Sequence, residues 1–511
     1  MIGTDREGDR AARAAGHGSA EREGLAIRMS MAEAVRGRAR RQGLGALVCA
    51  TALLAAGCTS SSDEGPDPVS PRAGAQVTAP SCTAPPDAPA QAAAPVGKKR
   101  APDGDFNGDK IDDFAVEGWY RPVDGGTWRQ NRAFVPGAKK RLDAADAVSL
   151  SEVFPKMQDK GGNPRLHGAT VRVPRDLDGD GLGDLVFQDA KQRQYVVWGD
   201  RKGRHSATRL DAGVISLIDL PAGDVDGDGQ TDLIGHPARL RDGGCHLYVL
   251  RGPLGRDGRP AAMTGLDLGQ EGTLTVRTSL TGDFTGDGRT DLLVESLTGE
   301  DSMEGDYPAP SDRVDLYTGS DDGLVYAGRA KGIPDVLVAG LVADFDGDGA
   351  DDLYLDPEDG PTKLYHGGPT AFLDGPRATG MAMASFPAAS GDVNGDGLLD
   401  LLEVASGRNH PEGEVKVYEG SKEGLVPGRS VNRKTVGMKP GKPGFEVDSD
   451  QFGKTSALVD VNGDGFDDLL AGYVGYHKPR EEQGYWVVPG TKDGLTGEGS
   501  YFLTTRELGT S

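Results

Sequence analysis

The sequence predicts an all-β fold built from repeats, and three observations support this prediction. A nine-residue motif, D-x-[DNT]-G-D-x-x-x-D, occurs seven times between residues 105 and 468. A short apolar run follows each copy, as at 291–294 and 468–472, and it reads as a buried strand and not as an amphipathic helix. The chain also holds 78 glycines among 511 residues but only 6% aromatic residues. This composition suits many short strands joined by turns.

A second shared feature is a strand that ends in glycine and follows the motif after a variable connection. Each unit would then have four strands. They are one strand before the motif, the apolar run directly after it, the glycine-terminated strand and one more. The motif copies start 71, 48, 59, 61, 48 and 68 residues apart, as expected when a common unit carries loops of different lengths. Divided by seven, residues 98–511 allow about 59 residues per unit. The sequence therefore predicts a seven-bladed β-propeller of four-stranded blades, with the motif between strands 1 and 2. The glycine-terminated strands are 195–199, 247–252, 314–319, 364–367, 415–420 and 485–490.

The motif has the donor chemistry of a calcium site. Calcium takes about six to eight oxygen ligands, which side chains at positions 1, 3, 5 and 9 and the carbonyl of position 7 would supply. Glycine, which allows a tight turn, stands at position 4 in all copies and at position 6 in all but the first, where Lys110 replaces it. We expect the loops with Lys110 and Thr285 to bind most weakly. We predict up to seven Ca²⁺ ions, held by Asp105, Asn107, Asp109 and Asp113; Asp176, Asp178, Asp180 and Asp184; Asp224, Asp226, Asp228 and Asp232; Asp283, Thr285, Asp287 and Asp291; Asp344, Asp346, Asp348 and Asp352; Asp392, Asn394, Asp396 and Asp400; and Asp460, Asn462, Asp464 and Asp468.

Two other interpretations of the motif fit the sequence less well. An EF-hand needs a glutamate at position 12 and flanking helices, but position 12 is glutamate only in the sixth copy, at Glu403. A metal-free acidic turn would crowd together the 24 carboxylates of the seven loops, which repel one another without a cation. Calcium is therefore the preferred interpretation.

The start of the chain, residues 1–57, is predicted to be a signal peptide with a possible N-terminal extension. Arginines at 36–41 precede an apolar run of 13 residues at 44–56. The run is shorter than the roughly 20 residues that span a bilayer, and small residues end it, as in a secretory signal. The sequence predicts export of the mature chain.

The residues at the end of that run resemble a bacterial lipobox. They read Leu53-Leu54-Ala55-Ala56-Gly57-Cys58, with Ala55 at the position where leucine is commoner. The resemblance implies cleavage after Gly57 and a lipid on Cys58. Residues 58–97 are rich in Ser, Pro and Ala and are predicted to form a disordered tether. We expect the domain to lie outside the cell, anchored to the membrane only by Cys58, or to be secreted.

The repeats resemble FG-GAP (VCBS-type) repeats, found in the N-terminal propeller of integrin α-subunits and in bacterial relatives. The last copy carries the fullest form, with Phe452-Gly453 before the loop and Ala471-Gly472 after it. The resemblance covers about residues 98–511, although the Phe-Gly pair is missing or degraded in the other six copies and the segment before Asp105 is too polar for a good inner strand. It implies a calcium-binding propeller whose ligands bind on the face away from the calcium loops.

Strand topology also indicates that partners bind on the face away from the calcium loops. In a four-stranded up-and-down blade the 1–2 and 3–4 loops lie on one face, and the 2–3 and 4–1 loops lie on the other. The longest and most aromatic connections fall in the 2–3 positions, and loops on a rigid scaffold often bind partners. We expect an unidentified surface protein or glycan to bind there. The candidate contacts are Trp119, Tyr120, Trp128, Tyr307, His410, Tyr473 and Tyr476.

Other function classes are less favoured. The net charge of −23 leaves no basic stripe for nucleic acid. No GxSxG, HExxH or P-loop motif occurs, and the histidines are scattered among the repeats. We predict a monomeric, non-enzymatic binding or adhesion module. The alternatives are a carbohydrate-active or other enzyme that uses the central channel, because residues from different blades could meet there, and a purely structural scaffold.

The four cysteines, Cys49, Cys58, Cys82 and Cys245, form no CxxC pair. Cys82 lies in the tether and Cys245 in a blade. A disulfide between them and a free buried thiol at Cys245 are equally compatible with the sequence.

Overall fold

The computed structural model describes residues 82–83 and 104–509, with several internal segments left out. Every described residue belongs to one compact unit, Glu64–Glu300 with Ala309–Ser511. The predicted signal peptide and nearly all of the tether lie outside the described residues. Among the residues that are described, no helix is long and apolar enough to cross a membrane. The internal segments left out are 121–128, 155–165, 170–174, 190–192, 212–216, 219–220, 238–243, 269–273, 299–312, 334–336, 338–339, 356–361, 376, 381–386, 408–409, 439–450 and 475–482.

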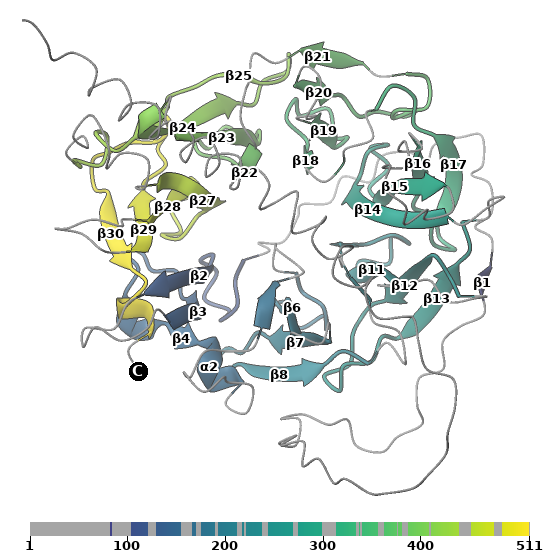
Figure 1. The fold of residues 1–511 in the computed structure, drawn as a ribbon, viewed down its shortest axis with the longest axis horizontal. Coiled ribbons are helices and arrows are strands. Elements are labelled where there is room, and N and C mark those ends of the chain that lie inside the picture. Colours follow the sequence, from purple (N-terminus) through teal and green to yellow (C-terminus); the bar gives the residue numbers. More distant parts are fainter. Residues whose placement is uncertain are drawn as a thin grey trace, which may run out of the picture. The chain divides into compact units, whose positions relative to one another are not determined.

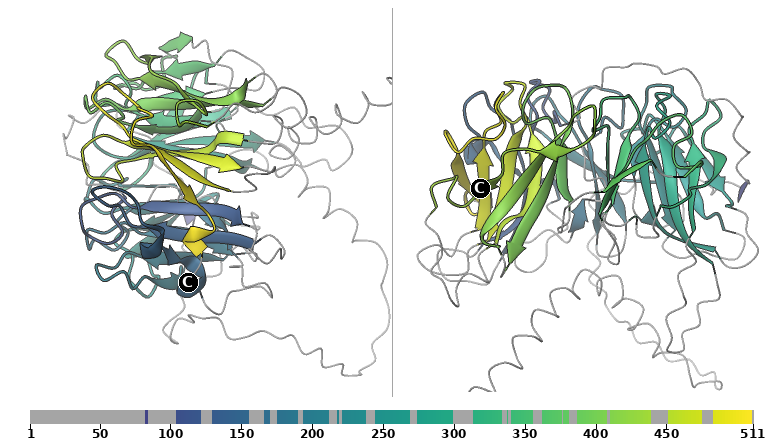
Figure 2. Two further views of the ribbon diagram at one scale, coloured as in Figure 1. Left: turned by 90° about the vertical axis from the view of Figure 1, so that its left-hand side faces the viewer. Right: turned by 90° about the horizontal axis from the view of Figure 1, so that it is seen from above.

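This unit is a ring of seven β-sheets, numbered here as blades 1–7 in chain order (Figure 1). Within each blade the central strands pair antiparallel with their neighbours in the chain. Seen edge-on, the strands run between the two faces of the ring (Figure 2). The predicted seven-bladed propeller is confirmed.

Blades 1–4 contain the following elements. Blade 1 contains β2 (Phe114–Tyr120), β3 (Arg129–Val135) and β4 (Val148–Ser149), with the short helices η1 (Ala144–Asp146) and α2 (Leu150–Val153). Blade 2 contains β5 (Leu166–Ala169), β6 (Leu185–Asp189), β7 (Gln194–Trp198) and β8 (Ser206–Arg209). Blade 3 contains β1 (Cys82–Thr83), β9 (Leu217–Ile218), β10 (Ala222–Gly223), β11 (Asp232–Pro237), β12 (Leu247–Arg251) and β13 (Ala262–Leu266). Blade 4 contains β14 (Leu274–Gly282), β15 (Asp291–Thr298), β16 (Arg313–Thr318) and β17 (Val325–Arg329).

Blades 5–7 complete the ring. Blade 5 contains β18 (Gly340–Ala343), β19 (Asp352–Leu355), β20 (Lys363–Tyr365) and β21 (Ala378–Gly380). Blade 6 contains β22 (Pro387–Gly391), β23 (Asp400–Gly407), β24 (His410–Glu419), β25 (Val426–Pro427) and β26 (Val431–Asn432). Blade 7 contains β27 (Gln451–Val459), β28 (Asp468–Val474), β29 (Gln483–Val488) and β30 (Tyr501–Thr504), followed by the short helix η3 (Glu507–Gly509).

The prediction of four strands per blade holds for most blades but not for all. Blade 1 has three strands among the described residues, and the polar segment expected to form its inner strand is not described. Blade 6 has five strands because β26 adds to β24. Blade 3 has six, because β9 pairs with β11 and β1 adds at the outer edge.

The hydrophobic core lies between neighbouring blades, and each of the seven core clusters joins two of them. Strand β15 shows how this works. Leu292 and Val294 pack toward blade 3, whereas Leu293 packs toward blade 5. Alternate side chains of a strand point to opposite faces of its sheet, and here both faces are covered. The sequence after each motif is therefore a continuous apolar run without polar alternation.

Packing between blades 7 and 1 closes the ring. The rings of Phe114 in β2 and Tyr485 in β29 meet edge to face with centroids 5.0 Å apart. The backbone N–H of Leu142 donates to the hydroxyl of Tyr501 in β30, 2.9 Å away. Leu508 of η3 is buried in the same cluster. The three described strands of blade 1, β2, β3 and β4, thus pack against blade 7 as other neighbouring blades pack against each other.

A disulfide joins the predicted tether to the propeller. Cys82 and Cys245 are bonded, with an S–S distance of 2.17 Å. Cys82 and Thr83 form β1, which pairs in parallel with Gly265 and Leu266 of β13. The prediction that all of 58–97 is a disordered tether is therefore wrong at these two residues, because strand pairing and a covalent bond hold them on blade 3. Of the two alternatives for Cys245, the structure shows the disulfide.

Candidate metal sites

The seven Asp-rich loops share one hydrogen-bonded conformation, described here as loops 1–7 with motif positions 1–9. At position 1 the aspartate turns back onto its own loop and accepts backbone N–H bonds. In loop 2, Asp176 Oδ1 accepts from Gly179 at 2.7 Å and Oδ2 accepts from Gly181 at 2.8 Å. The bond from position 6 to position 1 recurs in all seven loops. In each loop the position 5 aspartate also accepts from the N–H of position 7.

This winding requires a left-handed backbone at positions 4 and 6. All the motif glycines at these positions have positive φ, between 71° and 91°. Lys110 occupies position 6 of loop 1 with a φ of 72°, so a residue with a side chain adopts the conformation that glycine adopts elsewhere. Such a conformation costs an L-residue about 1–2 kcal/mol.

Replacing Lys110 with glycine is therefore expected to stabilise the protein by about 0.5–1 kcal/mol, once the greater freedom of glycine in the unfolded chain is subtracted. Urea unfolding in saturating calcium would measure the change. Lys110→Ala is the matched control, because alanine removes the same charge but keeps the strained φ. An equal gain in both variants would assign the effect to the charge and contradict the backbone explanation.

The position 9 aspartate connects each loop to the end of strand 3. Its Oδ1 accepts from the N–H of the glycine that ends that strand, at 2.7–3.0 Å in all seven blades. In most loops Oδ2 accepts from the N–H of position 2, as Asp184 does from Leu177 at 2.9 Å. These seven residues are between 0 and 4% exposed. Sequence reasoning assigned position 9 to metal binding alone, but it also holds the blade together.

Burial raises the pKa of six of the position 9 carboxylates, those of Asp113, Asp184, Asp232, Asp291, Asp400 and Asp468. The pKa of Asp184 and that of Asp291 are raised to about 8, mainly by burial and further by the carboxylates at neighbouring loop positions, against the opposing effect of the backbone N–H bonds. The pKa values of Asp113, Asp400 and Asp468 are raised to about 7 for the same reasons. A bound divalent cation would supply the missing counter-charge, and ligand carboxylates bind metal in the ionised form.

The carboxylates of three loops converge closely enough to share an ion. Loops 2, 3 and 5 are the three with aspartate at every ligand position, and in each of them three carboxylate oxygens lie within 4.8 Å of one another. The donor set of these loops therefore fits a calcium ion. The converging groups are Asp176, Asp178 and Asp184; Asp224, Asp226 and Asp232; and Asp344, Asp346 and Asp348.

In three of the four loops with a neutral residue at position 3, namely loops 1, 4 and 7, that residue donates to position 9. Thr285 Oγ1 donates to Asp291 Oδ2 at 3.0 Å, and Asn462 Nδ2 donates to Asp468 Oδ2 at 3.0 Å. The internal donor partly takes the place that a cation would occupy. This geometry agrees with the expectation that the Thr285 loop binds calcium weakly.

Arginines of blade 3 contact the carboxylates of two all-aspartate loops. Arg256, in the β12–β13 connection, lies 2.5 Å from Asp178 and 2.6 Å from Asp180 of loop 2. Arg251, at the end of β12, contacts Asp226 of loop 3. These loops thus attract cationic groups, and a calcium ion would have to displace the arginines.

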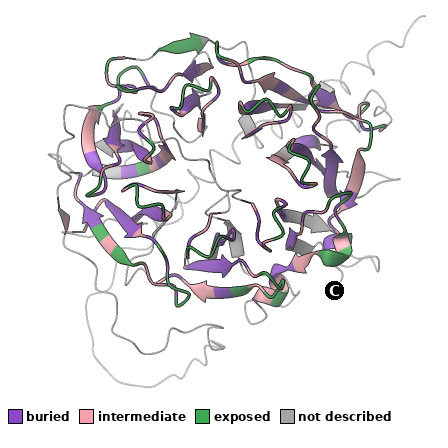
Figure 3. Cartoon of the chain, turned by 180° about the vertical axis from the view of Figure 1, so that it is seen from behind, coloured by how far each residue is buried: buried purple, intermediate pink, exposed green. Residues whose placement is uncertain are grey.

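Hydrogen bonds between successive loops join them on one face of the ring. In loops 2, 4, 5 and 7 the N–H of position 8 donates to the position 1 carbonyl of the preceding loop, as Thr290 does to Asp224 at 2.8 Å. The chain just after strand 3 donates to the position 2 carbonyl of the preceding loop, as Ala138 does to Val461 at 2.8 Å across the closure. Exposed turns of the loops surround the centre of this face (Figure 3). The 3–4 connections therefore share a face with the loops, as predicted.

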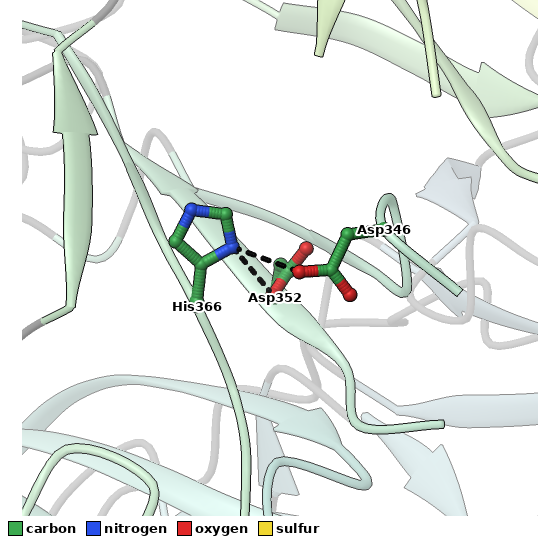
Figure 4. A group of neighbouring side chains, drawn as sticks. All are labelled: Asp346, Asp352 and His366. Carbon is green, nitrogen blue, oxygen red and sulfur yellow. Dashed lines mark hydrogen bonds and ion pairs between the residues drawn. The ribbon is translucent and has the colours of Figure 1, made fainter. Parts of the chain in front are cut away.

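His366 was not singled out by the sequence reasoning, yet it lies at loop 5 (Figure 4). Its Nδ1 is 3.2 Å from Asp346 Oδ2 and 3.5 Å from Asp352 Oδ1. The hydrogen bond with Asp352 raises the pKa of His366. The sequence contains a signal for this placement. His366 directly precedes Gly367, the glycine that ends strand 3, and the N–H of Gly367 donates to the position 9 aspartate Asp352.

The structure removes Tyr473 from the predicted partner-binding set. This residue lies in β28, is 3% exposed, and packs against the ring of Phe502, with centroids 5.9 Å apart. The Arg433 guanidinium lies over its ring at 5.9 Å. Side chains of blades 6 and 7 cover the tyrosine, so it offers no surface to a partner.

The other predicted contacts are placed only in part. Trp119 and Tyr120 end β2 and His410 begins β24, without described side chains. Trp128, Tyr307 and Tyr476 lie outside the described residues. The partner-binding face therefore stays a prediction.

Comparison with known families identifies one repeat. Residues 452–485, which include loop 7, match the family model of the FG-GAP repeat. The predicted FG-GAP resemblance is confirmed for this segment, and the seven-bladed ring agrees with a propeller like that of integrin α-subunits.

Comparisons with whole proteins give remote similarities. No curated protein matches the chain in sequence. The structure of the Dos1 propeller matches with 9% identity and a TM-score of 0.37, over 80% of this chain and 90% of that one. BBS1N in complex with ARL6DN matches with 13% identity and a TM-score of 0.35, over 65% of this chain and 80% of that one. The Bacillus licheniformis rhamnogalacturonan lyase PL11 matches with 13% identity and a TM-score of 0.27, over 61% of this chain and 65% of that one.

Proposed function

We propose that this protein is an exported, calcium-stabilised β-propeller that acts as a binding module on the cell surface. The observation that carries the proposal is the shared conformation of seven Asp-rich loops, in which several carboxylates are crowded together and the one at position 9 is buried. Calcium bound to the loops would relieve that repulsion and reinforce the contacts between blades. The calcium is structural in this proposal, and the partner binds elsewhere.

Counting bound metal tests the calcium part directly. The chain from residue 59 onward keeps Cys82 and omits the other two N-terminal cysteines. After equilibration in calcium, native mass spectrometry is expected to show several bound calcium ions and no more than seven. Loop 4, which has Thr285 at position 3, should fill last. A chain that binds none would overturn the proposal.

Export is supported by the disulfide, because such bonds persist mainly outside the reducing cytosol. FG-GAP repeats are also typical of extracellular domains. In this proposal Cys58 carries the lipid. The chain between Cys58 and Cys82 is 24 residues long, so the outer edge of blade 3 can lie at most about 80 Å from the membrane attachment point. Metabolic labelling with a palmitate analogue should mark the wild-type chain but not Cys58→Ser.

The partner is proposed to bind the face opposite the loops, through the aromatic 2–3 connections. Tryptophan and tyrosine dominate many binding energies because they combine a large apolar ring with a polar edge. Trp119→Ala combined with Trp128→Ala is expected to weaken binding about tenfold or more. Flow cytometry of the labelled chain on producing cells that lack their own copy would measure this.

The matched control for this experiment is Lys422→Ala, an exposed residue on the loop face, which should leave binding unchanged. Protease-treated and periodate-treated cells would distinguish a protein partner from a glycan. Equal binding by the double variant and the wild type would contradict the assignment of the face. The enzymatic alternative has no specific observation in its favour among the described residues.

A further inference from the structure

One blade differs from the other six at the position next to its loop. The residue before the glycine that ends strand 3 is Pro136, Trp198, Arg251, Thr318, His366, Glu419 or Pro489 in blades 1–7. The glycine N–H after it is bonded to the position 9 aspartate, so this residue is held beside its own loop. Only blade 5 places an imidazole there, and imidazole nitrogen favours zinc and other transition metals.

The imidazole of His366 faces two ligands of loop 5. One ring nitrogen of His366 and one carboxylate oxygen each of Asp346 and Asp352 all lie within 4.8 Å of one another. The side chains of His366 and Asp346 are each 14% exposed, and that of Asp352 is 0% exposed. Figure 4 shows the ring nitrogen directed at both carboxylates.

The two distances from Nδ1 are close to those between ligands of a small divalent ion. Tetrahedral zinc with bonds of about 2.0–2.1 Å sets its ligand atoms roughly 3.3–3.4 Å apart. Nδ1 lies 3.2 Å from Asp346 and 3.5 Å from Asp352. Little rearrangement would be needed to bring all three atoms onto one ion.

A second contact orients the ring as a ligand. His366 Nε2 is 3.0 Å from Thr379 Oγ1 in β21. When the proton sits on Nε2 and is donated to Thr379, Nδ1 offers its lone pair on the side of the two carboxylates, where a bound cation would lie. A metal-bound histidine usually has its other ring nitrogen donating in this way.

We propose that loop 5 is a transition-metal site in which Asp346, Asp352 and His366 bind a zinc-type divalent ion in place of calcium. Calcium prefers oxygen ligands, whereas imidazole nitrogen favours zinc and its neighbours in the first transition series. The inference rests on the proposed metal-binding function of the loops. It makes one blade of the ring respond to a different ion from the others.

The test compares the chain from residue 59 onward with His366→Gln. Both are freed of metal, dialysed against excess calcium with micromolar zinc, and analysed for bound metals. The wild type is expected to hold one zinc ion, and His366→Gln should bind zinc at least about tenfold more weakly with its calcium count not reduced. His205→Gln is the control, because this histidine bonds to the Trp198 carbonyl and not to a carboxylate of its loop. Cobalt substituted for zinc should give visible absorption bands in the wild type and in the control only.

The outcomes separate the two proposals. Calcium in the loops with no zinc, or zinc retained equally by His366→Gln, would overturn the inference and leave the calcium proposal standing. No metal of either kind would overturn both. If His366→Gln fails to fold, Thr379→Val replaces it, because that change keeps all three ligands and removes only the orienting acceptor. It should weaken zinc binding about tenfold, and an unchanged zinc affinity would count against the site.

Discussion

Chelation of calcium is expected to lower the melting temperature of the chain from residue 59 onward by roughly 5–15 °C. Extracellular calcium modules bind with dissociation constants of about 10⁻⁴–10⁻³ M. At about 2 mM free calcium, each such site stabilises the folded state by about 0.6–1.8 kcal/mol. Seven sites would contribute about 5–13 kcal/mol, and an unfolding entropy of about 2.1 cal/mol/K per residue converts this to the stated shift.

The arrangement of the loops explains why the effect should appear as one large shift. Loops 2, 4, 5 and 7 each donate a hydrogen bond to the loop before them, as Gly183 does to Asp105 at 2.7 Å. The position 9 aspartates also tie every loop to strand 3. Loosening one loop therefore weakens the contact between two blades, and the buried carboxylates left behind repel one another.

Differential scanning calorimetry with calcium, with excess EDTA and with EDTA followed by calcium would measure this shift. Readdition of calcium should restore the original melting temperature, whereas magnesium at the same concentration should restore little, because it demands a tighter octahedral site. An unchanged melting temperature together with full loss of bound calcium would show that the loops are not structural sites. That result would contradict the first part of the proposed function.

The fold could be predicted from the sequence because its signals are local and repeated. Each loop carries its own glycines and its own acceptors for backbone N–H groups, so a nine-residue window suffices to recognise it. Strands such as β15, buried on both faces, appear as unbroken apolar runs. Seven copies of weak signals reinforce one another, which a single copy could not do.

Features that depend on neighbouring blades could not be predicted in the same way. Tyr473 was assigned to a surface loop, but residues of blades 6 and 7 bury it. His366 stands 20 residues from Asp346 in the sequence, and only the return of strand 3 brings them together. Cys82 reaches Cys245 across 163 residues, a separation at which spacing indicates nothing about pairing.

Loss of that disulfide is expected to destabilise the protein by about 2–5 kcal/mol. The bond spans a sequence separation of 163 residues that includes blades 1 and 2. In the chain-entropy model, closing a loop of this length restricts the unfolded chain by about 5 kcal/mol, which is the upper end of the expected range. By the same unfolding entropy, the melting temperature should fall by roughly 2–6 °C.

The native ring should survive this change. The strand β1 adds only two residues to the edge of β13, and the core between blades 2 and 3 is otherwise built from apolar side chains of the blades themselves. Cys82→Ser combined with Cys245→Ser is therefore expected to keep its calcium count while it unfolds at a lower temperature.

Calorimetry of the wild type and the double variant, each with and without reductant in saturating calcium, would measure the effect. Reductant should lower the melting temperature of the wild type to that of the variant and leave the variant unchanged. If reductant frees both thiols of the wild type, as shown by mass spectrometry, but leaves its melting temperature unchanged, the bond does not stabilise the fold and serves only to attach β1. Its role would then be to fix where the N-terminal segment meets the propeller, at the outer edge of blade 3 and not at blade 1.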